Sequence, residues 1–113
     1  MKKPVVNISS ILDQIRNKAA ELLPAGSRLA LFGSRAQGSF REDSDWDLNI
    51  LIPGEENLSL SIISRYAYPL ECLGWELNQD FSVMVYSYKG WEKRNFLPFY
   101  KNVENDKIIL FQN

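Results

Sequence analysis

The most constraining feature of the sequence is the heptapeptide WDLNILI at residues 46–52, which alternates between two kinds of side chain. Successive side chains of a strand point to opposite faces of a sheet, so the alternation predicts a strand with one apolar face and one mixed face. The two faces comprise Trp46, Leu48, Ile50 and Ile52 on one side, and Asp45, Asp47, Asn49 and Leu51 on the other. The segment therefore favours a sheet that is packed on one face and partly open on the other.

Apolar residues at helical spacing predict two long helices. The first is expected to be capped by Ser9 or Ser10 and to run to about residue 23, before Pro-Ala-Gly. The second is expected from residue 59 to about 73, with Pro69 kinking or splitting it and Gly74 ending it.

Three further strands are expected at 28–33, 81–87 and 107–111, the last as a short strand or an extended tail. A short helix is expected near 97–104. This order of elements predicts one domain over residues 1–113 of the α/β (α+β) class, with helices covering one face of the sheet.

Composition excludes several classes of function. The net charge is −1, which provides no overall attraction to nucleic acid or to an anionic membrane, and we find no strong basic patch. No apolar run is long enough to span a bilayer. The N-terminus breaks at Pro4 and turns polar by Asn7, unlike a signal peptide, so a cytoplasmic location is expected.

Missing residue types narrow the possible chemistry. The chain has no histidine and only one cysteine, Cys72, so a Ser-His-Asp triad, a histidine zinc site and a disulfide are all excluded. Any catalysis must rest on carboxylates, hydroxyls, lysine, arginine, backbone N–H groups and a bound metal ion.

Two short motifs carry the candidate chemistry. Gly33-Ser34 follows the strand at 28–33, where a glycine permits a sharp turn and close approach to a ligand, and free N–H groups favour an anion. Asp45 and Asp47 project to the same side of a strand and repel each other, which a divalent cation such as Mg²⁺ would relieve. The ordinary alternatives are a serine helix cap and two solvated aspartates.

The combination of these motifs resembles the nucleotidyltransferase superfamily of the DNA polymerase β type. Its pattern, Gly-Ser, a short stretch ending in glycine and then Asp-x-Asp at the start of a strand, is matched by Gly33, Ser34, Gly38, Asp45 and Asp47. The spacing is similar to that of the minimal nucleotidyltransferases, which are small domains of about this length. The resemblance implies a small mixed sheet with an open active-site face.

The resemblance also implies roles for individual residues. Gly33 and Ser34 would hold the phosphates of a nucleotide, most simply ATP, while Asp45 and Asp47 would hold one or two Mg²⁺ ions. An acceptor hydroxyl would attack the α-phosphorus and pyrophosphate would leave. Arg35 has two interpretations: it provides positive charge for the phosphate, or it is a solvated or surface-paired arginine.

Members of this superfamily usually carry a third carboxylate on the neighbouring strand, and this sequence departs from that pattern. The matching position is Ser82, a poor metal ligand. Asp80 has the same strand parity, and either reaches the metal or belongs to the turn before the strand. Gln37 also stands where relatives often have a basic residue.

Two functions follow from the resemblance. The chain is either an Mg²⁺-dependent nucleotidyltransferase, whose acceptor can be a HEPN-domain protein as in toxin–antitoxin pairs, or a catalytically degenerate domain that binds a partner. Both predict a partner protein or self-association. The candidate contact residues are five aromatic residues: Trp75, Trp91, Phe96, Phe99 and Tyr100. For most of them, packing in the core is the simpler interpretation.

Overall fold

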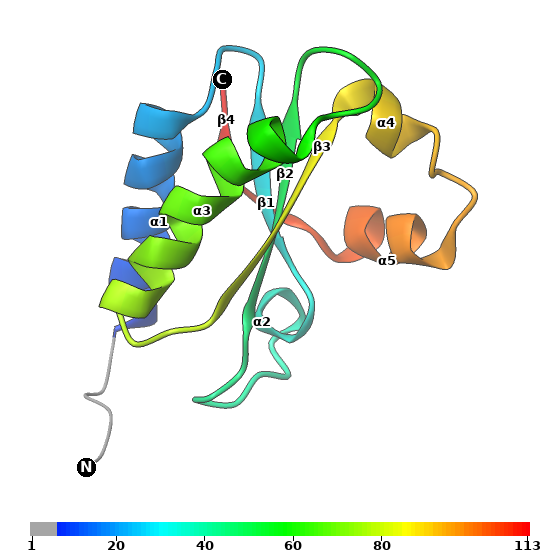
Figure 1. Cartoon of the computed structure of the whole chain (residues 1–113). Coiled ribbons are helices and arrows are strands. Elements are labelled where there is room, and N and C mark those ends of the chain that lie inside the picture. The colour runs from blue at the N-terminus through cyan, green and yellow to red at the C-terminus, as the bar shows by residue number, and fades with distance from the viewer. Residues whose placement is uncertain (1–6) are drawn as a thin grey trace.

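The computed structural model describes residues 7–113, in which a four-stranded sheet lies between two groups of helices (Figure 1). The elements in chain order are α1 (Ile8–Leu22), β1 (Arg28–Phe32), α2 (Ser34–Gln37), β2 (Trp46–Ile52), α3 (Leu60–Glu76), β3 (Phe81–Ser87), α4 (Tyr88–Glu92), α5 (Pro98–Asp106) and β4 (Ile108–Gln112). The strand order is β3-β2-β1-β4, with β2 parallel to β3 and β1 antiparallel to both its neighbours. The predicted mixed sheet and α/β class are confirmed.

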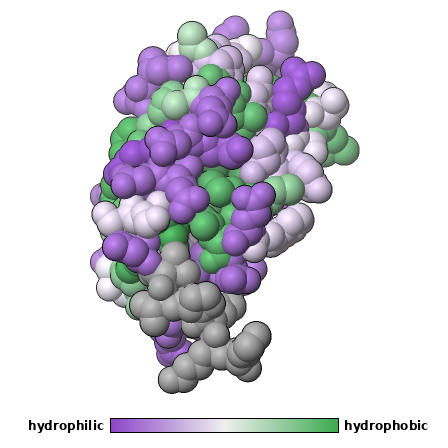
Figure 2. Space-filling view, turned by 90° about the vertical axis from the view of Figure 1, so that its left-hand side faces the viewer, coloured by the Kyte–Doolittle hydropathy of each residue, from purple (hydrophilic) through white to green (hydrophobic). Residues whose placement is uncertain are grey.

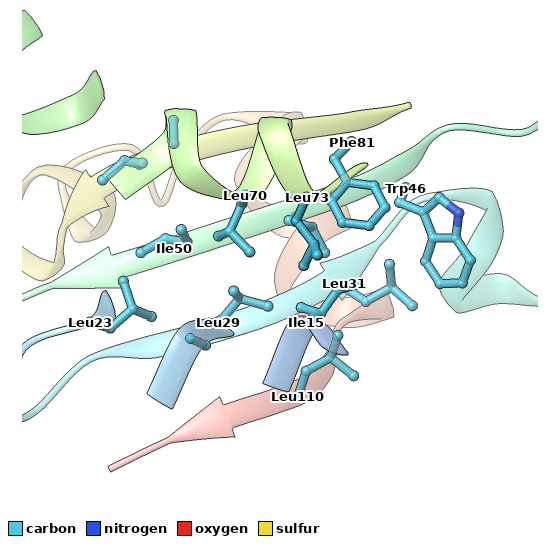
Figure 3. Close-up of a cluster of buried hydrophobic side chains, with 14 of the residues drawn as sticks. Ile15, Leu23, Leu29, Leu31, Trp46, Ile50, Leu70, Leu73, Phe81 and Leu110 are labelled. Carbon is cyan, nitrogen blue, oxygen red and sulfur yellow. The ribbon is translucent and has the colours of Figure 1, made fainter. Parts of the chain in front are cut away.

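The helices α1 and α3 cover the first face of the sheet, as the apolar alternation of β2 predicts (Figure 1). Their buried side chains meet those of all four strands in one cluster, part of which Figure 3 shows. Its largest fully buried members include Ile11, Ile15, Leu29, Trp46, Leu48, Ile50 and Leu70. Burial of this apolar surface is the main term that stabilises the fold.

The ends of the two long helices differ from the sequence-based expectation. The cap of α1 is Asn7, whose Oδ1 accepts a hydrogen bond from the Ser9 amide at 2.9 Å, and not Ser9 or Ser10. α3 continues through Pro69 to Glu76, so the predicted end at Gly74 is wrong. Gly74 is small for a packing reason, because a Cβ there would lie 2.8 Å from Cγ of Phe81.

The second face is less open than predicted, because α4 and α5 lie over part of it (Figure 1). Leu51 of β2 packs there with Trp91 and Val103 in a small apolar cluster. The sequence analysis missed α4, whose signal is the cap residue Ser87: its Oγ accepts from the Gly90 amide at 2.9 Å. Asn49, expected on the open face, is fully buried and accepts a hydrogen bond from Arg28.

A partly buried ion pair joins α5 to this second face. Arg28 of β1 donates to Oε2 of Glu104 on α5 at 2.8 Å and to Oδ1 of Asn49 at 3.2 Å. The indole of Trp91 donates to the same Glu104 oxygen at 2.8 Å. Burial acts to raise the pKa of Glu104, but the hydrogen bonds from Arg28 and Trp91 and the charge of Arg28 lower it to about 2.

The candidate contact aromatics separate into two groups. Trp91 is buried, whereas Trp75 and Phe96 are 59% and 69% exposed. The outer face of the α1 and α3 layer is mostly hydrophilic, with apolar residues reaching the surface in its middle (Figure 2). Across the described part of the chain, no helix combines the length and apolarity that crossing a membrane requires. The interpretation of the N-terminus as lacking a signal peptide rests partly on residues 1–6, which lie outside the described residues.

Candidate active site

The two sequence motifs meet at one end of the sheet, the lower end in Figure 1. β1 ends at Phe32, and the antiparallel register pairs Phe32 with Asp47 near the start of β2. Gly33 is therefore placed directly beside Asp47, although fourteen positions separate them in the sequence. The structure brings the predicted phosphate turn and the predicted metal-binding carboxylate together.

Gly33 is required by both backbone and space. Its φ of 72° and ψ of −158° belong to a region that only glycine occupies without strain. A Cβ at this position would overlap Oδ2 of Asp47. The missing side chain lets the Asp47 carboxylate lie against the start of the turn.

The turn after Gly33 is a single helical turn, α2. The amides of Ala36 and Gln37 donate to the Gly33 carbonyl, and Gly38 closes the turn in the left-handed conformation with its amide on the Ser34 carbonyl. No side chain caps its N-terminus. Ser34 is the first residue of this turn and is half-exposed. A phosphate oxygen can accept hydrogen bonds from such a hydroxyl and from amides at such a turn.

Asp45 and Asp47 form an unneutralised pair of carboxylates. Asp45 is exposed and Asp47 is half-buried. Burial raises the pKa of Asp47, and the charge of Asp45 raises it further. Within residues 7–113 neither takes part in an ion pair. Their carboxylate oxygens are the kind of ligand that a divalent cation such as Mg²⁺ requires. A bound cation would also offset the repulsion between the two charges and the cost of partly burying one of them.

Arg35 is buried, pairs with no carboxylate among the residues that the structure describes, and points to the loop before β2. Its side chain is buried between two rings, with Cζ 4.6 Å from the Phe40 centroid and 4.4 Å from that of Trp46. Its Nη2 donates to the carbonyls of Ser44 at 3.0 Å and Glu42 at 3.1 Å. Burial lowers the pKa of Arg35, and nearby Asp43 opposes that shift.

The strand β3 contributes a serine where a third carboxylate was sought. Ser82, the position matched to that carboxylate, is directly in register with Asp47 and is exposed. Asp80 precedes β3, is exposed, and accepts a hydrogen bond from the Trp46 amide through its backbone carbonyl. Among residues 7–113, no group of three or more acidic or cysteine side chains is placed to hold a metal ion. Asp80 therefore does not join the Asp45 and Asp47 pair in such a group.

Sequence reasoning also missed a long-range contact of the site. Gln37, identified only as a departure from a basic residue, donates through Nε2 to Oδ2 of Asp106 at 2.7 Å. Asp106 is the last residue of α5, so this hydrogen bond links α2 to the helix over the second face. The partner lies 69 positions away, and no local pattern indicates the pair.

Comparisons with known proteins bear on the family and the fold. A family model described as "Nucleotidyltransferase domain" matches residues 12–110. A search of curated proteins gave no significant match. Three solved structures share the fold. The first is a toxin–antitoxin with AMP-PNP, 19% identical, covering 90% of this chain and 73% of that one at a TM-score of 0.65.

The second is a putative nucleotidyltransferase from Sulfolobus solfataricus, 15% identical, covering 93% of this chain and 83% of that one at a TM-score of 0.63. The third is a variant of the toxin–antitoxin MntA-HpeT in which two aspartates two positions apart are replaced by glutamate. It is 16% identical and covers 90% of this chain and 73% of that one at a TM-score of 0.62. The family model spans most of the sequence, including both motifs of the site, and the chain belongs to the nucleotidyltransferase domain family.

Proposed function

We propose that the chain is a divalent-metal-dependent nucleotidyltransferase that transfers a nucleoside monophosphate, AMP from ATP, to a hydroxyl group of a partner protein. The observation that carries the proposal is the placement of the Asp47 carboxylate against Gly33, at the start of the Ser34 turn. A metal-binding group and a phosphate-binding group at this separation suit a nucleotide whose phosphates bridge them.

Each residue of the site has a separate task in this proposal. Ser34 and the amides at the start of α2 bind the β- and γ-phosphates of the nucleotide and fix the α-phosphorus in front of the acceptor. Asp45 and Asp47 hold one or two Mg²⁺ ions. The bound metal supplies charge stabilisation for the transferred phosphoryl group and for the leaving oxygen.

The reaction balances without a histidine. The acceptor oxygen forms a bond to the α-phosphorus, the bond between that phosphorus and the bridging oxygen of the β-phosphate breaks, and pyrophosphate departs. The acceptor proton passes to solvent water at this open end of the sheet.

The proposed acceptor is a partner protein. Two of the solved relatives are toxin–antitoxin proteins, one of them with the nucleotide analogue AMP-PNP. The exposed Trp75 and Phe96 offer apolar contact area of the kind that partner surfaces use. A HEPN-domain protein is the acceptor that the resemblance implies.

A second candidate function rests on Ser82. A serine in register with Asp47 leaves the site with one carboxylate fewer than active relatives usually have. In this alternative the domain binds a partner without transferring a nucleotide, and the site is a remnant.

The test is calorimetric titration of a non-hydrolysable ATP analogue in the presence of Mg²⁺. It compares the wild type, the double variant Asp45→Asn/Asp47→Asn, and the control Asp43→Asn, which changes an exposed aspartate of the same loop. We expect binding in the wild type and the control, and at least tenfold weaker binding in the double variant. No binding by the wild type to any of several nucleoside triphosphates would reject the transferase and favour the partner-binding module.

A further inference from the structure

We propose that Arg35 is a positioning residue of this site, which ties the phosphate turn to the loop that presents Asp45 and makes no contact with phosphate itself. The inference rests on the proposed function and assigns to Arg35 a different task from phosphate binding. It is carried by the hydrogen bonds of the guanidinium and by its burial between two aromatic rings.

The hydrogen bonds of Arg35 reach the peptide that precedes Asp45. Both Nε and Nη2 donate to the Ser44 carbonyl, at 3.3 and 3.0 Å. That carbonyl belongs to the peptide group between Ser44 and Asp45, so its orientation determines where the Asp45 side chain starts. Because Arg35 follows Ser34 directly in the chain, a single side chain connects the two halves of the site.

The loop has few other internal bonds that fix this peptide. Ser44 closes a turn on Arg41: its amide donates to the Arg41 carbonyl at 3.1 Å, and its Oγ accepts from the Arg41 amide at 2.7 Å. Those bonds hold the turn together but do not attach it to α2. The fork of Arg35, which also reaches the Glu42 carbonyl, makes that attachment.

Phosphate binding by Arg35 would require this arrangement to be broken. The side chain is 8% exposed, and its planar group lies against Phe40 and Trp46. Leaving this place would remove the donors of two carbonyls and both ring contacts. A planar guanidinium has several donors in a fixed geometry and can bind both carbonyls at once, whereas the ammonium group of lysine is a single point charge without that geometry.

The test separates positioning from phosphate binding by measuring metal and nucleotide in turn. Mn²⁺, a paramagnetic substitute for Mg²⁺, is titrated without nucleotide into the wild type, Arg35→Lys, Arg35→Met and the control Arg41→Lys, and free Mn²⁺ is followed by electron paramagnetic resonance. A nucleotide analogue is then titrated at saturating Mn²⁺. Circular dichroism establishes that each variant is folded.

We expect both Arg35 variants to bind Mn²⁺ about tenfold more weakly than the wild type, the effect usual for groups that orient metal ligands. At saturating Mn²⁺ their nucleotide affinity is expected to stay within about twofold of the wild type. Arg41→Lys should match the wild type in both titrations. Phe40→Ala, which removes one ring from the guanidinium, should weaken Mn²⁺ binding in the same direction by a smaller factor.

Two other results would overturn the inference and can be told apart. Unchanged Mn²⁺ affinity together with weak nucleotide binding at saturating Mn²⁺, partly restored in Arg35→Lys, would make Arg35 a phosphate ligand and leave the proposed function intact. Absence of Mn²⁺ binding in the wild type, or binding that survives Asp45→Asn/Asp47→Asn, would remove the metal site and with it both the proposed function and this inference.

Discussion

The two faces of the sheet are built from the same strands but stabilised in different ways. On the first face, α1 and α3 enclose one continuous apolar cluster that contains Ile50 of β2. On the second face, a small apolar cluster around Leu51 lies beside a partly buried ion pair, and the two aspartates follow at the end of the sheet. Because the side-chain period of a strand is two residues, β2 contributes to the core and to the site at the same time.

The contrast shows how a chain of this size can hold unneutralised charge. The first face supplies most of the apolar burial, so the second face can place Asp47 beside Gly33 even though burial and the charge of Asp45 oppose its ionised form. Activity should therefore depend on the second face and stability mainly on the first.

The largest expected effect is on catalysis by the site itself. Asp47→Asn should lower the rate of nucleotidyl transfer by about 10³-fold, since a metal-bound carboxylate supports several kcal/mol of transition-state stabilisation. The measurement is release of pyrophosphate from the complex of the chain with its acceptor. The control Asp43→Asn should keep the wild-type rate, and a similar loss in both variants would refute a specific role of Asp47.

The next prediction compares two neighbouring residues of β2. Ile50→Ala on the first face should cost about 3 kcal/mol of unfolding free energy, and Leu51→Ala on the second face about 2 kcal/mol. Both side chains are buried, at 0% and 2% exposure, but Leu51 belongs to the smaller cluster beneath two short helices, which can move to fill a cavity. Urea unfolding monitored by circular dichroism gives both values. An equal or larger cost for Leu51→Ala would contradict the division between the faces.

The ion pair of the second face should appear in the pH dependence of stability. The pKa of Glu104 is lowered to about 2 from an ordinary value of 4.5, so its contribution is complete above pH 4.5 and is lost as the pH falls through about 2. Glu104→Gln should cost about 2 kcal/mol at neutral pH, after allowance for the exposed quarter of the side chain, and almost nothing near pH 2.

Unfolding in urea at several pH values tests this prediction. Glu76→Gln, which changes an exposed glutamate of α3, is the matched control and should differ little from the wild type at any pH. A difference between Glu104→Gln and the wild type that stays constant down to pH 2 would show that the ionised pair does not stabilise α5.

The sequence predicts those parts of the molecule that depend on local spacing. The apolar face of β2 follows from a period of two residues, and the turn at Gly33 follows from the glycine at the end of a strand; the structure has both. Contacts between distant segments have no such pattern. Arg28 and Glu104 are 76 positions apart, and each alone is an ordinary charged residue. The covering of the second face by α4 and α5 was missed for this reason.

Arg35 and Gly74 show a second limit of sequence reasoning, which is that one residue type serves several purposes. An arginine directly after a Gly-Ser turn is typical of a phosphate ligand. Only its burial between Phe40 and Trp46 indicates a different task. A glycine near the end of a helical pattern, such as Gly74, is typical of a helix C-terminus. Only the position of Phe81 shows that Gly74 is small because the two residues pack together.

The smallest expected effect concerns the cost of placing Asp47 on the second face. Its pKa is raised above the ordinary 3.8, so the folded chain binds that proton more tightly than the unfolded chain does. Stability is therefore lost as the pH rises from about 3.8 through the folded value. In EDTA at neutral pH, Asp47→Asn should be more stable than the wild type by about 0.5 kcal/mol, a small gain because Asp47 is partly exposed.

Thermal unfolding with EDTA and then with Mg²⁺ measures this effect. Mg²⁺ should raise the melting temperature of the wild type and leave Asp47→Asn unchanged, because only a chain that binds the ion in its folded state gains stability from it. The same substitution that abolishes activity should then be the one that stabilises the metal-free chain. If Asp47→Asn is less stable than the wild type in EDTA, the carboxylate supports the fold, and the site is a structural feature of the second face and not a charge held there for catalysis.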